Sequence, residues 1–165
     1  MRRRNLHAFA LSLSCVLLAA GCGGDARAGL SASALVTRED AERVLGVPAR
    51  LRSEEGDGAE STCVYVDAKG DEAMSLQVTV QRAESAEQVR AAEDIAKRVL
   101  SESNIPVEPV EGVGDAAWLE KREGSLTLHA RKGSVAFLIG VEKGVDREPS
   151  YAELERLARR VADRL

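Results

Sequence analysis

The chain has 165 residues and a net charge of -4, from 23 Lys and Arg against 27 Asp and Glu. This length favours one domain, and a chain that is 44% hydrophobic and 30% charged can bury a core rather than remain disordered. The acidic balance argues against nucleic-acid binding, which needs basic side chains to neutralise phosphates. Only 3% of the residues are aromatic, so no aromatic surface for sugars or nucleobases is expected.

The start of the chain has the features of an export signal. Arg2, Arg3 and Arg4 form a positive segment. Residues 6–20 follow as an apolar run of roughly fifteen residues, which is about 22 Å long as a helix. That is shorter than the roughly 30 Å core of a bilayer, and no second basic cluster follows. A charged start, a short apolar run and a small-residue end are typical of a signal peptide.

The end of this signal carries a more specific pattern. Residues 18–22 read Leu-Ala-Ala-Gly-Cys and resemble the lipobox of bacterial lipoproteins. In that family a diacylglyceryl group is attached to the cysteine sulfur, and a peptidase cleaves directly before it. The resemblance implies cleavage after Gly21, lipidation of Cys22 and a signal peptide of residues 1–21. Ala19 stands where the family more often has leucine. The alternative is an ordinary cleaved signal peptide that leaves Cys22 free or disulfide-bonded.

The other two cysteines fit the same interpretation. Cys15 lies inside the apolar run, so Cys63 is the only further thiol expected in the mature domain. A lone cysteine in an exported protein is expected to be buried as a small apolar side chain. If Cys22 carries no lipid, a Cys22–Cys63 disulfide is the alternative. No neighbouring residue would lower the pKa of the Cys63 thiol, so we expect no catalytic role for it.

Residues 22–36 consist mainly of small residues and are expected to form a flexible tether, followed by a single domain over residues 37–165. Thr37 is expected to cap a short helix that stops at Gly46. The acidic, glycine-rich segment 54–60 is expected to be a solvated loop, because it lacks the carboxylate spacing of a calcium loop. Alternating apolar and polar residues then predict a hairpin of two strands, at residues 62–68 and 74–81.

A second helix is predicted from Ser85 to about residue 101, with Glu93–Lys97 as an ion pair on its solvated side. Its apolar face consists of Val89, Ala92, Ile95, Ala96 and Val99. Residues 104–115 contain two prolines and two glycines and are expected to be an extended loop.

Three further strands are predicted, beginning at residue 116 and at residues 125–131 and 135–141, followed by a final helix that Ser150 caps. The order is therefore helix, two strands, helix, three strands, helix. This order predicts an α+β fold in which three helices pack on one face of an antiparallel sheet of about five strands.

Several packing and turn features of the mature region are similar to those of small bacterial envelope lipoproteins of unknown function. They are Leu45-Gly46-Val47-Pro48, Cys63-Val64-Tyr65, Gly112-Val113-Gly114-Asp115-Ala116 and the closing helix. This second resemblance implies a fold and a location, and it implies no activity.

Few residues of the mature chain are candidates for chemistry. His129 is its one histidine, and it is expected on the solvent side of its strand together with Thr127 and Arg131. The chain has no Gly-x-Ser-x-Gly motif and too few Cys and His residues for a zinc site. Trp118 is expected to pack in the core or under a loop, and a platform for a ligand is the alternative. The sequence thus predicts no catalytic residue, no metal site and no cofactor.

The sequence therefore predicts an exported protein that is lipid-anchored through Cys22 to the cell membrane or outer membrane, with its domain in the periplasm or outside the cell. We expect a non-catalytic lipoprotein that binds another envelope protein or assists an assembly. A lipoprotein that binds a small ligand or an ion, and an enzyme, are the alternatives. An exposed apolar patch would favour the protein partner, and an enclosed pocket beside Trp118 would favour the ligand. Acids or His129 meeting in a cleft with shifted pKa values would favour the enzyme.

Overall fold

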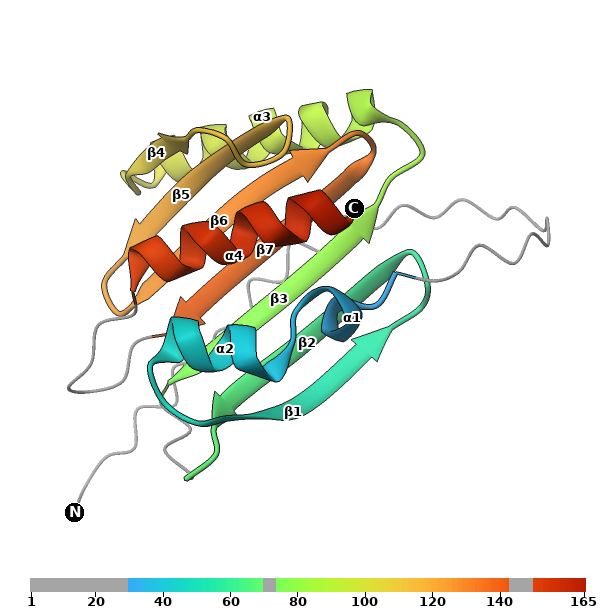
Figure 1. Cartoon of the computed structure of the whole chain (residues 1–165). Coiled ribbons are helices and arrows are strands. Elements are labelled where there is room, and N and C mark those ends of the chain that lie inside the picture. Colours follow the sequence, from blue (N-terminus) through green and yellow to red (C-terminus); the bar gives the residue numbers. More distant parts are fainter. Residues whose placement is uncertain (1–29, 70–73, 143–149) are drawn as a thin grey trace, which may run out of the picture.

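Seven antiparallel strands form one continuous sheet in the order β1-β2-β3-β7-β6-β5-β4 (Figure 1). The structure is a computed structural model that describes residues 30–69, 74–142 and 150–165. The strands are β1 (Ala49–Gly56), β2 (Glu60–Asp67), β3 (Ser75–Arg82), β4 (Val107–Val110), β5 (Ala116–Arg122), β6 (Ser125–Lys132) and β7 (Val135–Glu142). The helices are α1 (Ala32–Leu35), α2 (Arg38–Leu45), α3 (Ala86–Glu102) and α4 (Tyr151–Arg164).

The prediction of an α+β fold with five strands and three helices is wrong, because the described residues form a mostly β structure with seven strands and four helices. Both missed strands lie at the edges of the sheet. In β1 only Ala49 is buried, so the strand lacks the apolar alternation that identifies a half-buried strand. In β4 the side chain of Pro109 lies in a strand that pairs on one side only, where a missing N–H is tolerated. The segments 54–60 and 104–115 therefore contribute strand residues.

The fourth helix, α1, lies within residues 22–36, where the sequence suggested a tether. It is four residues long, which is too short to show a helical period in the sequence. The side chains of Ala32 and Val36 are fully buried. The hydroxyl of Tyr65 donates a hydrogen bond of 2.6 Å to the carbonyl oxygen of Val36 and joins this segment to β2.

The sequence suggested that all the helices pack on one face of the sheet, but the structure places them on both faces. Helices α1, α2 and α4 cover one face, which we call the core face, and α3 lies across the opposite one, the second face (Figure 1). Strand β5 shows the division, because Leu119 belongs to the apolar core whereas the adjacent Trp118 contacts Lys97 of α3.

The apolar core lies between the core face and its three helices. Phe137, Leu128 and Ile139 contribute from the sheet, and Leu154 and Leu157 contribute from α4, all fully buried. Each side chain of this size stabilises the fold by about 1.5–3 kcal/mol when it is removed from water. The predicted closing helix is confirmed, with the side chain of its N-cap, Ser150, accepting a hydrogen bond from a backbone N–H of its first turn.

Cys63 belongs to this core, which confirms the prediction that it is buried. Within the described part of the chain its thiol is paired with no other cysteine, and burial, together with the charge of Glu54, raises its pKa to about 12. A thiol with such a pKa remains protonated near neutral pH and is a poor nucleophile.

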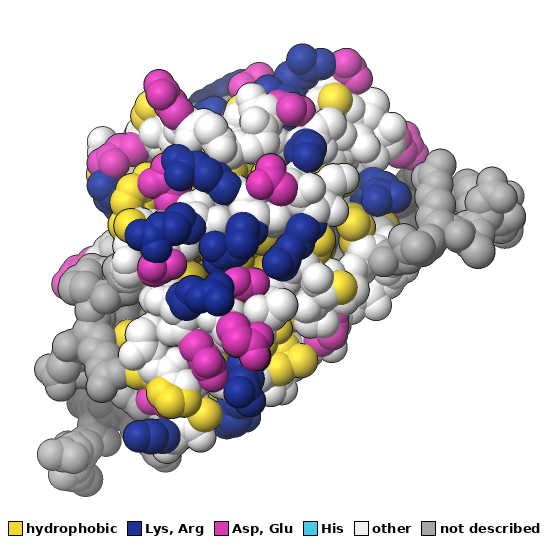
Figure 2. Space-filling model, viewed as in Figure 1, with side chains coloured by type: hydrophobic (Ala, Val, Ile, Leu, Met, Phe, Trp, Pro, Cys, Tyr) yellow, Lys and Arg dark blue, Asp and Glu magenta, His cyan; other side chains and the backbone are white. Residues whose placement is uncertain are grey.

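A buried carboxylate joins α2 to α4 above the core. Asp40 is the third residue of α2 and forms the reciprocal capping arrangement with Thr37, which confirms the predicted cap. Its side chain is 4% exposed and lies 3.0 Å from Arg43 Nη1 and 2.9 Å from Arg160 Nη2. Burial opposes ionisation, but the hydrogen bonds from Thr37 and the charges of Arg160 and Arg164 hold the pKa of Asp40 below its ordinary value. Basic and acidic side chains intermingle over this side of the molecule (Figure 2).

Candidate functional site

The second face of the sheet is largely polar, because the strands alternate. In the register of β3, β7 and β6, Leu138 lies between Thr79 and His129. One row further along, Gly140 lies between Gln77 and Thr127. The two rows therefore place one apolar side chain and one glycine at the centre of a polar surface.

Helix α3 covers only part of this face. Val89 and Leu100 are its buried residues, whereas Ile95 and Val99 are 51% and 49% exposed. Ile95 and Val99 belong to the apolar face expected for this helix, but they are not buried against the sheet. A helix that crosses the sheet near one end of the strands can bury only the stripe directly beneath it.

An aromatic and charged cluster lies beneath α3. The rings of Trp118 and His129 are stacked, with centroids 3.6 Å apart and an interplanar angle of 6°. Lys97 Nζ lies 5.8 Å from the centre of the Trp118 ring, within the range of a cation–π contact. Trp118 is 3% exposed, so it is buried, but it lies beneath helix α3 rather than in the core or under a loop. The predicted solvent-side position of His129 is wrong, because α3 and Trp118 cover it.

Glu120 continues this cluster along β5. Its carboxylate, in a residue that is 7% exposed, lies 3.0 Å from His129 Nε2 and also accepts a hydrogen bond from Arg122 Nε. Burial opposes ionisation of Glu120, but the contacts from His129 and Arg122 hold its pKa below the ordinary value. Burial lowers the pKa of His129 despite the nearby carboxylate, so the imidazole is neutral near pH 7 and donates to Glu120.

A second carboxylate, Glu93 of α3, contacts the sheet next to this pair. Its Oε1 lies 2.5 Å from Lys97 Nζ, and its Oε2 accepts a hydrogen bond of 3.1 Å from Arg131 Nε of β6. The predicted Glu93–Lys97 ion pair is confirmed, but the Glu93 side chain is only 14% exposed, so the pair does not lie on a fully solvated face. Polar contacts thus attach α3 to the sheet.

A hollow of about 210 Å³ lies between α3 and the sheet. We call it the apolar hollow, because most of its lining is apolar. Val89, Ala92 and Ala96 line it from the helix, and Trp118 and Leu138 line it from the sheet.

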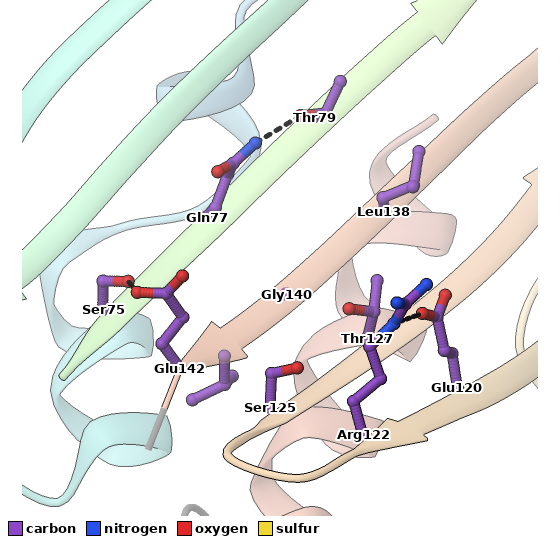
Figure 3. Close-up of a pocket in the computed structure, with 11 residues that line it drawn as sticks. Ser75, Gln77, Thr79, Glu120, Arg122, Ser125, Thr127, Leu138, Gly140 and Glu142 are labelled. Atoms are coloured by element: carbon purple, nitrogen blue, oxygen red, sulfur yellow. Dashed lines mark hydrogen bonds and ion pairs between the residues drawn. The ribbon is translucent and has the colours of Figure 1, made fainter. Parts of the chain in front are cut away.

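A second hollow, of about 270 Å³, lies over Gly140, and we call it the polar hollow (Figure 3). Its polar lining comes from β3, β5, β6 and β7: Ser75, Gln77, Thr79, Glu120, Arg122, Ser125, Thr127 and Glu142. A Cβ added to Gly140 would meet the Thr127 hydroxyl at 3.6 Å and no closer atom, so the glycine leaves room for a side chain. Leu138 lines both hollows, so the two lie next to each other along β7, and we call them together the trough.

This trough includes residues that the sequence analysis did not select. Glu120 and Gly140 were not predicted to be part of a site. The signal was the cross-strand register, because a hairpin between residues 116–122 and 125–132 places Glu120 opposite Thr127 and Trp118 opposite His129. Neither strand by itself identifies those neighbours.

The arrangement can bind and orient a molecule. Among the described residues, the imidazole of His129 hydrogen-bonds to Glu120, and no serine, threonine or cysteine side chain hydrogen-bonds to it. The described ranges also contain no group of three His, Cys, Asp or Glu side chains placed to hold a metal ion. Hydroxyl, amide and apolar groups therefore dominate what the trough offers to a ligand.

The predicted lipidation site, Cys22, and the predicted cleavage position after Gly21 lie outside the described residues. Within the described part of the chain, no helix is both long and apolar enough to cross a bilayer. Comparison with protein-family models, with curated proteins and with solved structures finds no match in any of the three.

Proposed function

We propose that this chain is a lipid-anchored protein of the bacterial cell envelope that binds a ligand on the second face of its sheet and carries out no chemistry on it. The observation that carries this proposal is the trough, in which an apolar and a polar hollow meet at Leu138. The core face cannot offer a comparable surface, because three helices cover it. An enclosed pocket beside Trp118 was the feature that would favour a ligand over a protein partner, and the apolar hollow lies beside Trp118 but is open to solvent.

The anchor is argued from the sequence. Residues 18–22 have the lipobox pattern, and the apolar run before them has the length of a signal peptide. A Cys22→Ala variant should lose label from radioactive palmitate and should no longer be cleaved after Gly21. Full labelling and membrane association of that variant would exclude the anchor.

The absence of chemistry is argued from the surroundings of His129. Glu120 and His129 meet in the trough with shifted pKa values, which is the feature that would favour an enzyme. A general base, however, needs an accessible nitrogen within hydrogen-bond reach of its substrate. Nε2 of His129 is bound to Glu120 and the ring is stacked on Trp118, so the burial of the ring is the reason to expect no chemistry. The side chain is 18% exposed. Glu120 and His129 instead form part of the lining of the trough and contribute to its charge.

Blocking the trough tests the binding function. The wild-type protein and a Gly140→Val variant would be extracted from their native membranes, and the co-purifying small molecules would be compared by mass spectrometry. A compound present at one equivalent with the wild type and depleted with the variant would support binding at the trough. Identical profiles for both proteins would contradict it.

Binding of another envelope protein is the second candidate function. The observation that favours it is the strip formed by Ile95 and Val99, two apolar side chains that are about half exposed on α3. A photo-crosslinking residue placed at position 95 would label one defined partner in living cells if this strip is an interface. The same residue at Arg90, which is exposed on a different side of α3, provides the matched control.

A further inference from the structure

We propose that the ligand of the trough is an amphiphile whose single apolar chain lies in the apolar hollow and whose uncharged, hydroxyl-bearing head group lies in the polar hollow. This inference rests on the proposed binding function and specifies its ligand. It follows from the order of the two hollows along β7, because Ala136 lines the apolar hollow, Leu138 lines both and Gly140 lines the polar one. A molecule that spans both hollows must change from apolar to polar at Leu138.

The apolar hollow favours a flexible chain over a rigid ring system. The small side chains of Ala92 and Ala96 line its helix side, together with Gln88, Val89 and Glu93, and its floor includes Leu138 and the buried Trp118. Burial of apolar surface is favourable by roughly 25 cal/mol per Å². A narrow space between a helix and a sheet allows a linear chain to bury most of its surface.

The charges of the polar hollow favour a neutral head group. Arg122 is its only basic lining residue among those described, and its guanidinium is ion-paired with Glu120. Glu142 accepts a hydrogen bond of 3.2 Å from the Ser75 hydroxyl. An anionic head would therefore face two carboxylates and one cation that is already paired, so repulsion would oppose it.

The remaining lining groups suit hydroxyl groups on the ligand. Side chains of Gln77, Thr79, Ser125 and Thr127 surround Gly140 from β3 and β6 (Figure 3). Hydroxyls donate and accept, and an amide side chain does both. Thr79 is already hydrogen-bonded to Thr62 and to Gln77. The hydroxyls of Ser125 and Thr127 and the amide oxygen of Gln77 are therefore the groups that can pair with a ligand hydroxyl. The bare backbone at Gly140 lets a ring or polyol approach the sheet closely.

The chain contains its own reporter for this site. Trp118 is the only tryptophan in the sequence, and it lines the apolar hollow. A change in its fluorescence reports a chain that enters that hollow. Binding of an amphiphile to another apolar part of the protein would leave the environment of Trp118 unchanged.

The full-length chain, made by cell-free synthesis, would be titrated with octyl glucoside below its micelle-forming concentration. We expect a saturable change in Trp118 emission. Octyl sulfate has the same chain with an anionic head, and we expect its Kd to be at least about tenfold higher. Equal affinities for the two probes would overturn the neutral head group, and no saturable change with octyl glucoside would overturn the ligand class.

One substitution tests the geometry of each hollow. Ala92→Phe would fill the apolar hollow and should raise the Kd for octyl glucoside by about tenfold or more, whereas Ala91→Phe, on the same helix but outside the hollow, should leave it unchanged. Gly140→Val should also weaken the binding of octyl glucoside. It should do so without loss of thermal stability, since valine is favoured in strands. Equal changes in the Kd for Ala91→Phe and Ala92→Phe would contradict the proposal that the chain of octyl glucoside lies in the apolar hollow.

The two proposals can fail separately. If octyl glucoside leaves Trp118 unchanged but a native compound is still depleted by Gly140→Val, the ligand class is wrong and the binding function stands. If no native compound depends on Gly140 and no probe binds, the binding function falls with the ligand class.

Discussion

The two faces of the sheet are built from the same strands and differ in almost every physical property. In β3, Leu76, Val78 and Val80 are fully buried on the core face, whereas Gln77 and Thr79 alternate with them and line the polar hollow on the second face. Because successive side chains of a strand point to opposite faces, one strand can serve packing and binding at once. The difference teaches that the residues that pack the core and the residues that line the trough are separated by face in this fold.

The helices repeat the contrast. Helix α4 buries five residues on the core face, whereas α3 is longer and buries two on the second face. The contacts of Glu93 with Arg131 and of Lys97 with Trp118 hold α3 over the sheet. Such contacts contribute less net stability than apolar burial of similar extent, so the second face tolerates an open trough that the core face would not.

The largest expected effect comes from neighbouring residues of β7 that point to opposite faces. Phe137 is fully buried on the core face, and Leu138 is partly exposed in the trough. Phe137→Ala should lower the free energy of unfolding by about 3–5 kcal/mol. Leu138→Ala should lower it by about 1 kcal/mol, because the site is already open to water. Urea denaturation of both variants measures the difference, and equal losses would contradict the separation by face.

The buried carboxylates provide the next comparison. Asp40→Asn should destabilise the protein by about 2 kcal/mol, because it leaves the partly buried guanidinium of Arg160 without its counter-charge. Glu120→Gln should cost about 1 kcal/mol, since the amide can still accept hydrogen bonds from His129 and Arg122. Thermal unfolding of the two variants tests the order, and a larger loss for Glu120→Gln would reverse it.

Sequence patterns predicted the core face well and the second face poorly. The alternation in β3 and the caps at Thr37 and Ser150 are local features, and the structure confirms them. The edge strands β1 and β4 have little burial and so no apolar period. The face chosen by α3 depends on where the chain returns to the sheet, and no local pattern encodes that.

The candidate site was missed for a related reason. Glu120, His129 and Gly140 become neighbours only through the pairing of β5, β6 and β7. Each has an ordinary local context, because an acid, a histidine or a glycine in a polar strand position is unremarkable by itself. The site could be predicted only after the register of the hairpin was known.

The second face should also respond to acid before the core face does. Burial lowers the pKa of His129 below its ordinary value of 6.5, so the folded state favours the neutral imidazole. Its contribution to stability is complete above about pH 6.5 and is lost as the pH falls towards the lowered pKa in the folded state. Hydrogen exchange should therefore show weaker protection of α3 at pH 5 than at pH 7.5, with β7 unchanged.

The control for this pH effect is His129→Gln, which keeps a donor for Glu120 and removes the titration. Glu120 also has a lowered pKa, but its contribution is lost only as the pH falls below its ordinary value of 4.5. Loss of α3 protection in both the wild type and His129→Gln between pH 7.5 and pH 5 would assign the effect to another group.

The smallest expected effect is at the outer side of α3. Ile95 and Val99 are about half exposed, so Ile95→Lys and Val99→Lys should change the free energy of unfolding by no more than about 0.5 kcal/mol. Leu100→Lys, on the buried side of the same helix, should destabilise much more, because it places an ammonium group against the sheet. A loss for Ile95→Lys as large as that for Leu100→Lys would mean that α3 is packed on both sides, and the second face would then be a covered layer rather than an open binding surface.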